Sequence, residues 1–158
     1  MPNWCQGVLK VRGTKENILN FLQNGIEAVN IFGGNAGKHT VEFDKYGDIE
    51  IKDVKGLLHI KNTRRNFIDK ISHDLCLREY SDDTFVLAID DFKAAWWIDA
   101  KPLAEISKKY GVDFKIYAFE MGIEFNQDIE IVAGKIVKDD EVKFNNYIWE
   151  CINPFIGG

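Results

Sequence analysis

Hydrophobic and polar positions alternate along most apolar segments of the chain, and this period of two predicts β-strands. The predicted strands cover residues 8–12, 40–44, 49–51, 57–60, 84–89, 112–119, 129–131, 136–137 and 142–149. Residues 84–89 form an almost continuous apolar run, which is typical of a central strand. Glycine-containing turns at Tyr46-Gly47-Asp48 and Ala133-Gly134 predict two hairpins.

Two other segments have helical spacing. In the first, Thr14 is a suitable N-cap and Gly25 suits the C-terminus, with an apolar stripe at Ile18, Leu19, Phe21, Leu22 and Ile26. The second begins around Asp99 and Pro102, and it ends at Gly111. Its expected buried side chains are Leu103, Ile106 and Tyr110. Residues 62–80 fit either a helical turn or a strand.

Two helices separated by hairpins, without a series of parallel βαβ crossovers, indicate an α+β fold. We therefore expect one domain over residues 1–158, with a ferredoxin-like antiparallel sheet. Two main helices would cover one face of this sheet, and the hairpins would add extra strands.

The overall charge limits the possible partners. The 158 residues carry a formal net charge of -5, which argues against direct nucleic-acid binding through a broad basic face. Lys61, Arg64 and Arg65 form the one basic cluster; a small phosphate or RNA could contact it, and a solvated turn is its simplest interpretation. A protein partner with a basic surface is compatible with this charge.

The spacing of the cysteines and the hydropathy of the chain indicate the cellular compartment of the protein. Cys5, Cys76 and Cys151 are widely spaced, which predicts reduced thiols in the cytoplasm, and the three histidines complete no zinc motif. We expect Cys5 and Cys151 to pack under the terminal segments. No apolar run has the length of a membrane helix, and no signal-peptide pattern is present. The sequence thus predicts a cytoplasmic protein without a membrane partner.

Several short motifs resemble those of the YubB-like proteins of phages, prophages and plasmids. They are Pro2-Asn3-Trp4-Cys5, 92–96 (FKAAW), 106–110 (ISKKY), 117–125 (YAFEMGIEF) and 149–151 (WEC). The resemblance covers about half of the chain and omits residues 29–81. It implies a decorated ferredoxin fold, a mobile genetic element in a bacterial host, and no established enzymatic activity. Small proteins of phages often bind and disable host machinery, including as anti-CRISPR inhibitors.

Two motifs suggest catalysis on inspection. The segment from Phe32 to His39 resembles a phosphate-binding loop, but it lacks the first glycine and the hydroxyl after Lys38, and a strand pattern follows it. Carboxylates at strand ends, Asp90, Asp91, Glu120 and Glu124, could hold a metal ion in a metal-dependent enzyme. No histidine or lysine converges on them in the sequence, and no cofactor motif is present.

A nucleophilic cysteine is a further possibility, but the sequence offers no recognisable histidine partner that would activate the thiol.

The adjacent tryptophans are the strongest candidate contact residues. Trp96 and Trp97 would point to opposite faces of a strand, or about 100° apart on a helix, so one apolar layer cannot easily bury both. Exposed tryptophan is enriched in binding hot spots. The alternative is core packing with both indole N–H groups hydrogen-bonded.

These observations favour a non-catalytic binding protein of a phage or mobile element, with counter-defence inhibition of the anti-CRISPR type as one form. Its partner would be a host or phage protein, such as a nucleic-acid-processing complex. The predicted contact residues are Trp96, Trp97, Asp90, Asp91, Glu120 and Glu124. Two alternatives are the metal-dependent enzyme and an RNA-binding module that stacks bases on Phe85, Phe114, Tyr117 and Phe119 of the sheet.

Overall fold

The computed structural model of the chain describes residues 2–30, 32, 34–68 and 74–158. Its strands are β1 (Trp4–Gly13), β2 (Ile26–Val29), β3 (Thr40–Phe43), β4 (Ile49–Lys52), β5 (Leu57–Ile60), β6 (Asn66–Ile68), β7 (Asp74–Leu75), β8 (Arg78–Ser81), β9 (Thr84–Ala95), β10 (Asp113–Glu120), β11 (Phe125–Val132) and β12 (Lys135–Lys143). The helices are α1 (Lys15–Asn20), which continues into a π-helical turn (Phe21–Gly25), α2 (Ala100–Tyr110) and α3 (Tyr147–Glu150).

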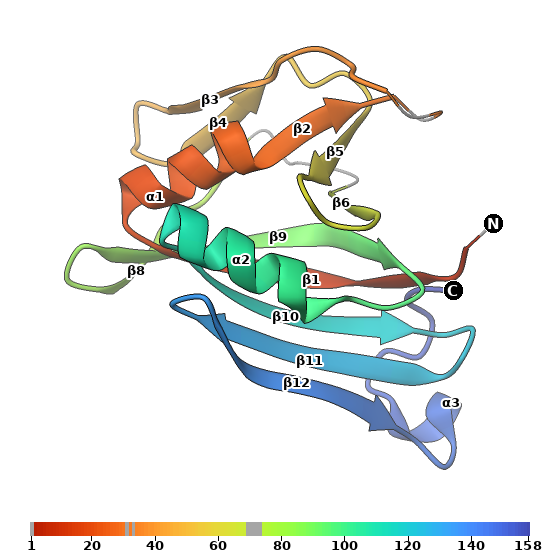
Figure 1. Cartoon of the computed structure of the whole chain (residues 1–158). Helices are drawn as coiled ribbons and strands as arrows, with labels where there is room; N and C mark the ends of the chain where they lie inside the picture. Colours follow the sequence, from red (N-terminus) through yellow and green to blue (C-terminus); the bar gives the residue numbers. More distant parts are fainter. Residues whose placement is uncertain (1, 31, 33, 69–73) are drawn as a thin grey trace.

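Most strands join one large antiparallel sheet (Figure 1). Its strand order is β12-β11-β10-β1-β9-β6-β5-β2, and β8 also pairs with β9. A second sheet has the order β3-β4-β7. The twelve-residue strand β9 therefore joins the C-terminal strands to those of the central segment.

The large sheet has one covered and one open face. Helix α2 packs against β10, β11 and β12, and α1 lies beside it on the same face (Figure 1). On β1, Leu9 and Val11 are buried, whereas Lys10 between them is exposed. This alternation places the core between the sheet and the helices, because successive side chains of a strand point to opposite faces.

Several local predictions are confirmed. Thr14 caps α1 by accepting a hydrogen bond from the Asn17 amide at 3.2 Å. Asp99 caps α2, and Gly111 ends it in the left-handed conformation. Both predicted hairpins, β3–β4 and β11–β12, are also present. These features depend on residues close together in the sequence.

The predicted ferredoxin-like α+β class is wrong. Strands account for 48% of the structure and helices for 17%, and the main sheet has nine strands. Helix α1 has only six residues, so the chain does not have two main helices. Ile26, expected in the first helix, instead begins β2, and the strands β2, β5, β6 and β8 extend the sheet beyond β9.

Two further segments differ from the predictions. Residues 62–80, left open between helix and strand, contribute β6, β7 and most of β8, while residues 69–73 lie outside the described part. The predicted final strand at 142–149 is wrong, because β12 ends at Lys143 and α3 follows. In α3, Asn146 provides an N-cap, which ends the extended conformation.

The predicted strand 84–89 continues as far as Ala95 through a β-bulge. Gly7 lies opposite Phe92 and Leu9 lies opposite Ile89, so Asp90 and Asp91 together face the single residue between Gly7 and Leu9. A bulge places an extra residue on one strand and changes the direction of its side chains. Asp90 and Asp91 are both exposed for this reason, and they do not end the strand.

The C-terminal segment returns to the start of β1. The amide of Gly158 donates a hydrogen bond to the Trp4 carbonyl at 2.9 Å. A Cβ at Gly157 would lie 2.3 Å from the Phe119 carbonyl oxygen, so this close approach requires glycine. Among the described residues, none of the helices combines the length and apolar character needed to cross a bilayer.

Candidate functional site

The chain makes a strained turn at Trp96, directly after β9. The Trp97 amide donates to the Ala95 carbonyl at 3.0 Å, and Trp96 between them has a φ of 72°. A two-residue hydrogen bond around a positive φ is the rare and strained form of the γ-turn. A non-glycine residue held in this way costs about 1–3 kcal/mol, and such strain concentrates at functional sites.

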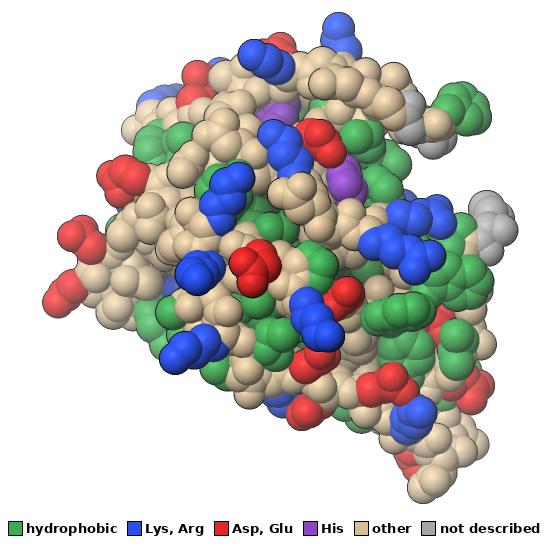
Figure 2. All heavy atoms as spheres, in the orientation of Figure 1, with side chains coloured by type: hydrophobic (Ala, Val, Ile, Leu, Met, Phe, Trp, Pro, Cys, Tyr) green, Lys and Arg blue, Asp and Glu red, His purple; other side chains and the backbone are tan. Residues whose placement is uncertain are grey.

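The turn leaves both indoles accessible. Trp96 is 39% exposed and Trp97 is 55% exposed. They line a groove of about 450 Å³ together with Ile123, Glu124, Phe125, Glu141, Lys143 and Phe144. We call this the Trp groove. Figure 2 shows hydrophobic side chains gathered near the end of β9, with basic side chains above them and mainly acidic ones below.

Gln127 on β11 holds the segment that follows the tryptophans. Its Oε1 accepts the Ile98 amide at 2.7 Å, and its Nε2 donates to the Ile98 carbonyl at 3.2 Å. The Gln127 side chain is buried. This paired contact joins the chain after Trp97 to β11 and thereby fixes one side of the Trp groove.

The turn between β10 and β11 also lines the Trp groove, through Ile123 and Glu124. Glu124 has a φ of 62°, so the groove contains a second non-glycine residue in the left-handed region. Glu120 is fully buried, and its carboxylate accepts the amides of Gly122 and Ile123. Glu120 therefore shapes this turn and does not reach the surface, although the sequence suggested it as a contact residue.

Helix α3 extends the apolar surface. Phe144, which lines the groove, contacts the Tyr147 ring with centroids 5.2 Å apart. The Tyr147 hydroxyl donates to Oδ1 of buried Asn126 at 3.0 Å, and this bond fixes α3 on β11. Further exposed apolar residues on this helix and the following segment are Ile148, Trp149, Ile152 and Phe155.

Burial changes the acidity of groups beneath this surface. Burial, followed by the charge of Glu120, raises the pKa of the Cys5 thiol to about 12. Burial also raises the pKa of Tyr147, with a hydrogen bond to Cys151 as the next cause. Cys5 and Cys151 are both buried, as expected for cysteines that pack under the terminal segments. Neither therefore has the accessible thiolate that nucleophilic chemistry requires.

The predicted carboxylates do not converge. Asp90 and Asp91 line a different groove, of about 500 Å³, beside the C-terminal residues Phe155 and Ile156. Glu124 lies in the Trp groove and Glu120 is buried. Within the described ranges, no group of three or more histidine, cysteine, aspartate or glutamate side chains could hold a metal ion. The geometry gives no support to the metal-dependent enzyme.

The four aromatic residues suggested for base stacking are also separated. Phe114 is buried in the core, and Phe85 packs against the core from its edge. Tyr117 and Phe119 share the open face, with ring centroids 5.3 Å apart. Two of the four residues can therefore contribute to one stacking surface.

The basic cluster lies near the Trp groove. The Arg65 carbonyl accepts the Ala95 amide at 3.2 Å, one residue before Trp96. The guanidinium of Arg65 lies 5.6 Å from the Trp4 ring centre, and Lys93 Nζ lies 4.6 Å from it. These cations thus lie over the ring of Trp4 in β1, whereas the exposed Trp96 and Trp97 follow the end of β9.

The glycine-rich segment does not form a phosphate-binding loop. Strand β3 follows it directly, where such a loop requires the N-terminus of a helix. His39 is buried, and its Nε2 lies 2.7 Å from the Leu22 carbonyl oxygen. Residue 33 of this segment, and residue 31 just before it, lie outside the described part.

The sequence reasoning found Trp96, Trp97 and Glu124 but missed the residues that position them. Gln127 and Asn126 are buried polar residues near the start of β11, before the alternating apolar residues Ile129 and Ile131. This break in alternation is the signal that could have identified them, because buried amides require specific partners. Ile123 and Phe144 gave no comparable signal.

Comparison of the chain with models of known protein families, with curated proteins and with solved structures found no match to any of them.

Proposed function

We propose that the protein is a non-catalytic binding protein that contacts a protein partner through the Trp groove. The observation that carries the proposal is the strained γ-turn, which keeps the indoles of Trp96 and Trp97 accessible. Tryptophan is one of the residues enriched among binding hot spots. The hydrogen bonds of Gln127 to Ile98 support a preorganised surface, which reduces the entropy lost on binding.

The charge around the groove supports a partner with a basic surface. Glu124 and Glu141 line it with one cation, Lys143, which is already paired with Glu141 at 3.0 Å. The whole chain carries a net charge of -5. We therefore propose a partner that inserts an apolar side chain between the tryptophans and places basic residues beside it.

The resemblance of several short motifs to those of YubB-like proteins supports a setting in a phage or another mobile element of a bacterial host. A counter-defence inhibitor of the anti-CRISPR type is the form of this proposal that fits an acidic binder, because nucleic-acid-processing complexes expose basic grooves. The partner in this form is a protein of such a complex.

The test compares proteins captured from bacterial lysates by the wild-type protein, Trp97→Ala and Tyr46→Ala. Tyr46 is 79% exposed in the β3–β4 turn and serves as the matched aromatic control. We expect one protein to be retained stoichiometrically by the wild type and the control, and about tenfold less by Trp97→Ala.

The captured protein is then purified and titrated at increasing salt concentration. A basic partner predicts an affinity that falls with ionic strength. Retention of no stoichiometric protein, or equal retention by Trp97→Ala and Tyr46→Ala, would contradict the proposal.

A further inference from the structure

A second pocket, of about 290 Å³, lies on the open face of the large sheet, away from the helices. Its lining includes the charged residues Lys10, Arg12, Asp113, Lys115 and Glu130, together with Tyr80 from β8. Val86 and Val132 add apolar surface. No residue of this pocket belongs to the lining of the Trp groove.

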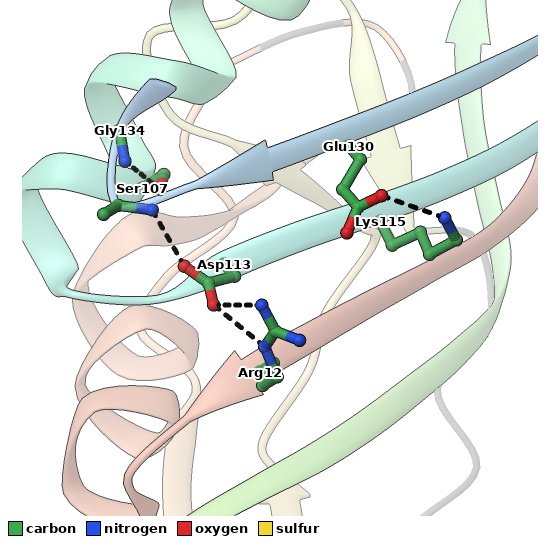
Figure 3. A network of polar contacts seen from close by, with 7 residues as sticks. Arg12, Ser107, Asp113, Lys115, Glu130 and Gly134 are labelled. Carbon is green, nitrogen blue, oxygen red and sulfur yellow. Dashed lines mark hydrogen bonds and ion pairs between the residues drawn. The ribbon is translucent and has the colours of Figure 1, made fainter. Parts of the chain in front are cut away.

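Arg12 is held in a fixed position in this pocket (Figure 3). Its Nε donates to Asp113 Oδ2 at 2.9 Å, and a terminal nitrogen lies 2.8 Å from the same oxygen. The other oxygen of Asp113 accepts the Ala133 amide at 2.9 Å. The guanidinium also lies 4.8 Å from the ring centre of Tyr80. Arg12 is therefore oriented before any ligand arrives.

Two lysines face one another across neighbouring strands. Lys10 on β1 pairs in register with Lys115 on β10. Lys115 Nζ lies 3.2 Å from Glu130, whereas the neighbour of Lys10 on β9 is the uncharged Ala88. Within the described part of the chain, Lys10 has neither an ion pair nor a side-chain hydrogen bond. Like charges directly opposite each other destabilise a sheet, so this arrangement needs a reason.

The pocket is positively charged in an acidic protein. It contains three cations, Lys10, Arg12 and Lys115, and two carboxylates, Asp113 and Glu130. A compact dianion placed between Lys10 and Lys115 would give Lys10 an ionic partner and would share the Lys115 ammonium with Glu130, so that both lysines donate a charge-assisted hydrogen bond to it. The valines and Tyr80 offer contacts to an uncharged group attached to that anion.

We infer that this pocket binds a small phosphate monoester, with the phosphate between Lys10 and Lys115 and its apolar or aromatic group against Tyr80 and Val86. The volume is near the lower limit for small-molecule sites, which suits a ligand of this size. The inference is independent of the proposed protein partner, because the two sites share no lining residue.

The experiment titrates the full chain with three probes by calorimetry. Phenyl phosphate carries both features of the ligand, inorganic phosphate carries the anion alone, and phenol carries the ring alone. We expect saturable binding of phenyl phosphate, weaker binding of inorganic phosphate and no binding of phenol. The affinity for phenyl phosphate should fall with added salt.

Lys10→Gln is the decisive variant, and Lys55→Gln, at an exposed position outside the pocket, is its control. Lys10→Gln should weaken phenyl phosphate binding by at least about tenfold. It should also melt at the same temperature as the wild type or higher, because it removes a like-charge pair. The control should bind as the wild type does.

Each opposite result overturns the inference. Absence of phenyl phosphate binding at millimolar concentration would show that the pocket does not bind phosphate monoesters. Unchanged affinity in Lys10→Gln would show that the phosphate lies elsewhere. Equal affinity for inorganic phosphate and phenyl phosphate would show that the phenyl group does not bind against Tyr80 and Val86.

Discussion

Trp96 shows how one residue conformation can define a surface. Its positive φ and the hydrogen bond between Trp97 and Ala95 turn the chain sharply at the end of β9. Without the turn, the two indoles would alternate across the sheet. With it, both line the same groove. The backbone strain is thus linked directly to the exposure on which the proposed binding depends.

The strain at Trp96 can be measured by comparing glycine and alanine at two neighbouring positions. At Trp96, we expect the glycine variant to be more stable than the alanine variant by about 1 kcal/mol, because glycine accepts positive φ. At Trp97, which has no positive φ, the alanine variant should be the more stable one. Urea unfolding of the four variants measures their free energies of unfolding. If the alanine variant is the more stable one at both positions, the backbone at Trp96 is not strained.

The three cysteines should differ in reactivity because they differ in burial. Cys76 is exposed, whereas Cys5 and Cys151 are buried. We expect a thiol reagent at neutral pH to modify Cys76 rapidly and the other two only after unfolding. The variant Cys76→Ala should show almost no rapid reaction. Rapid modification of a second thiol in the folded protein would show that the terminal segments open.

At the scale of elements, side-chain amides, one buried and one half-buried, connect separate parts of the chain. Gln127 joins β11 to the segment after Trp97. Gln23 has an equivalent role elsewhere, because its Nε2 donates to the His39 carbonyl at 2.9 Å and its Oε1 accepts the Val41 amide at 2.8 Å. The two glutamines make the same kind of contact at different sites.

This equivalence allows a controlled test of the Trp groove. We expect Gln127→Leu and Gln23→Leu each to lower the free energy of unfolding by about 1–3 kcal/mol, since each leaves backbone groups unpaired. Only Gln127→Leu should also weaken partner binding, because only Gln127 holds the segment beside Trp97. Equal partner binding by the two variants would show that Gln127 does not support the binding surface of the Trp groove.

At the scale of the whole molecule, the terminal segments and the sheet enclose titratable groups in their protonated form. Burial is the main cause that raises the pKa of Cys5 and of Tyr147. In the unfolded chain, these groups release their protons near the ordinary pKa of each side chain, 9.0 for the thiol and 10.0 for the phenol. The folded state keeps the protons to higher pH, so raising the pH favours unfolding.

The free energy of unfolding should therefore be constant up to about pH 9 and then fall, by up to about 1.4 kcal/mol per pH unit for each group. Urea unfolding at about pH 8, 9 and 10 measures this slope. In Cys5→Ala, the fall should begin about one pH unit later, where Tyr147 begins to contribute. Cys76→Ala is the control, and it should keep the wild-type profile. An identical alkaline profile for Cys5→Ala would contradict the role of Cys5.

The sequence by itself determined the local structure. It placed α2 with its caps at Asp99 and Gly111, the N-cap Thr14 and both hairpins, because capping, turn chemistry and alternation depend on neighbouring residues. It also identified Trp96, Trp97 and Glu124, which the structure brings into one groove.

Only the tertiary structure decided the fold class and the surroundings of the site residues. The strands added beyond β9, the burial of Glu120 and the facing lysines Lys10 and Lys115 all depend on strand partners distant in the sequence. Side-chain alternation gives the period of a strand but not its neighbours, so one pattern fits both a small α+β sheet and a nine-stranded one. The large sheet forms because β9 pairs with β1 along one edge and with β6 and β8 along the other.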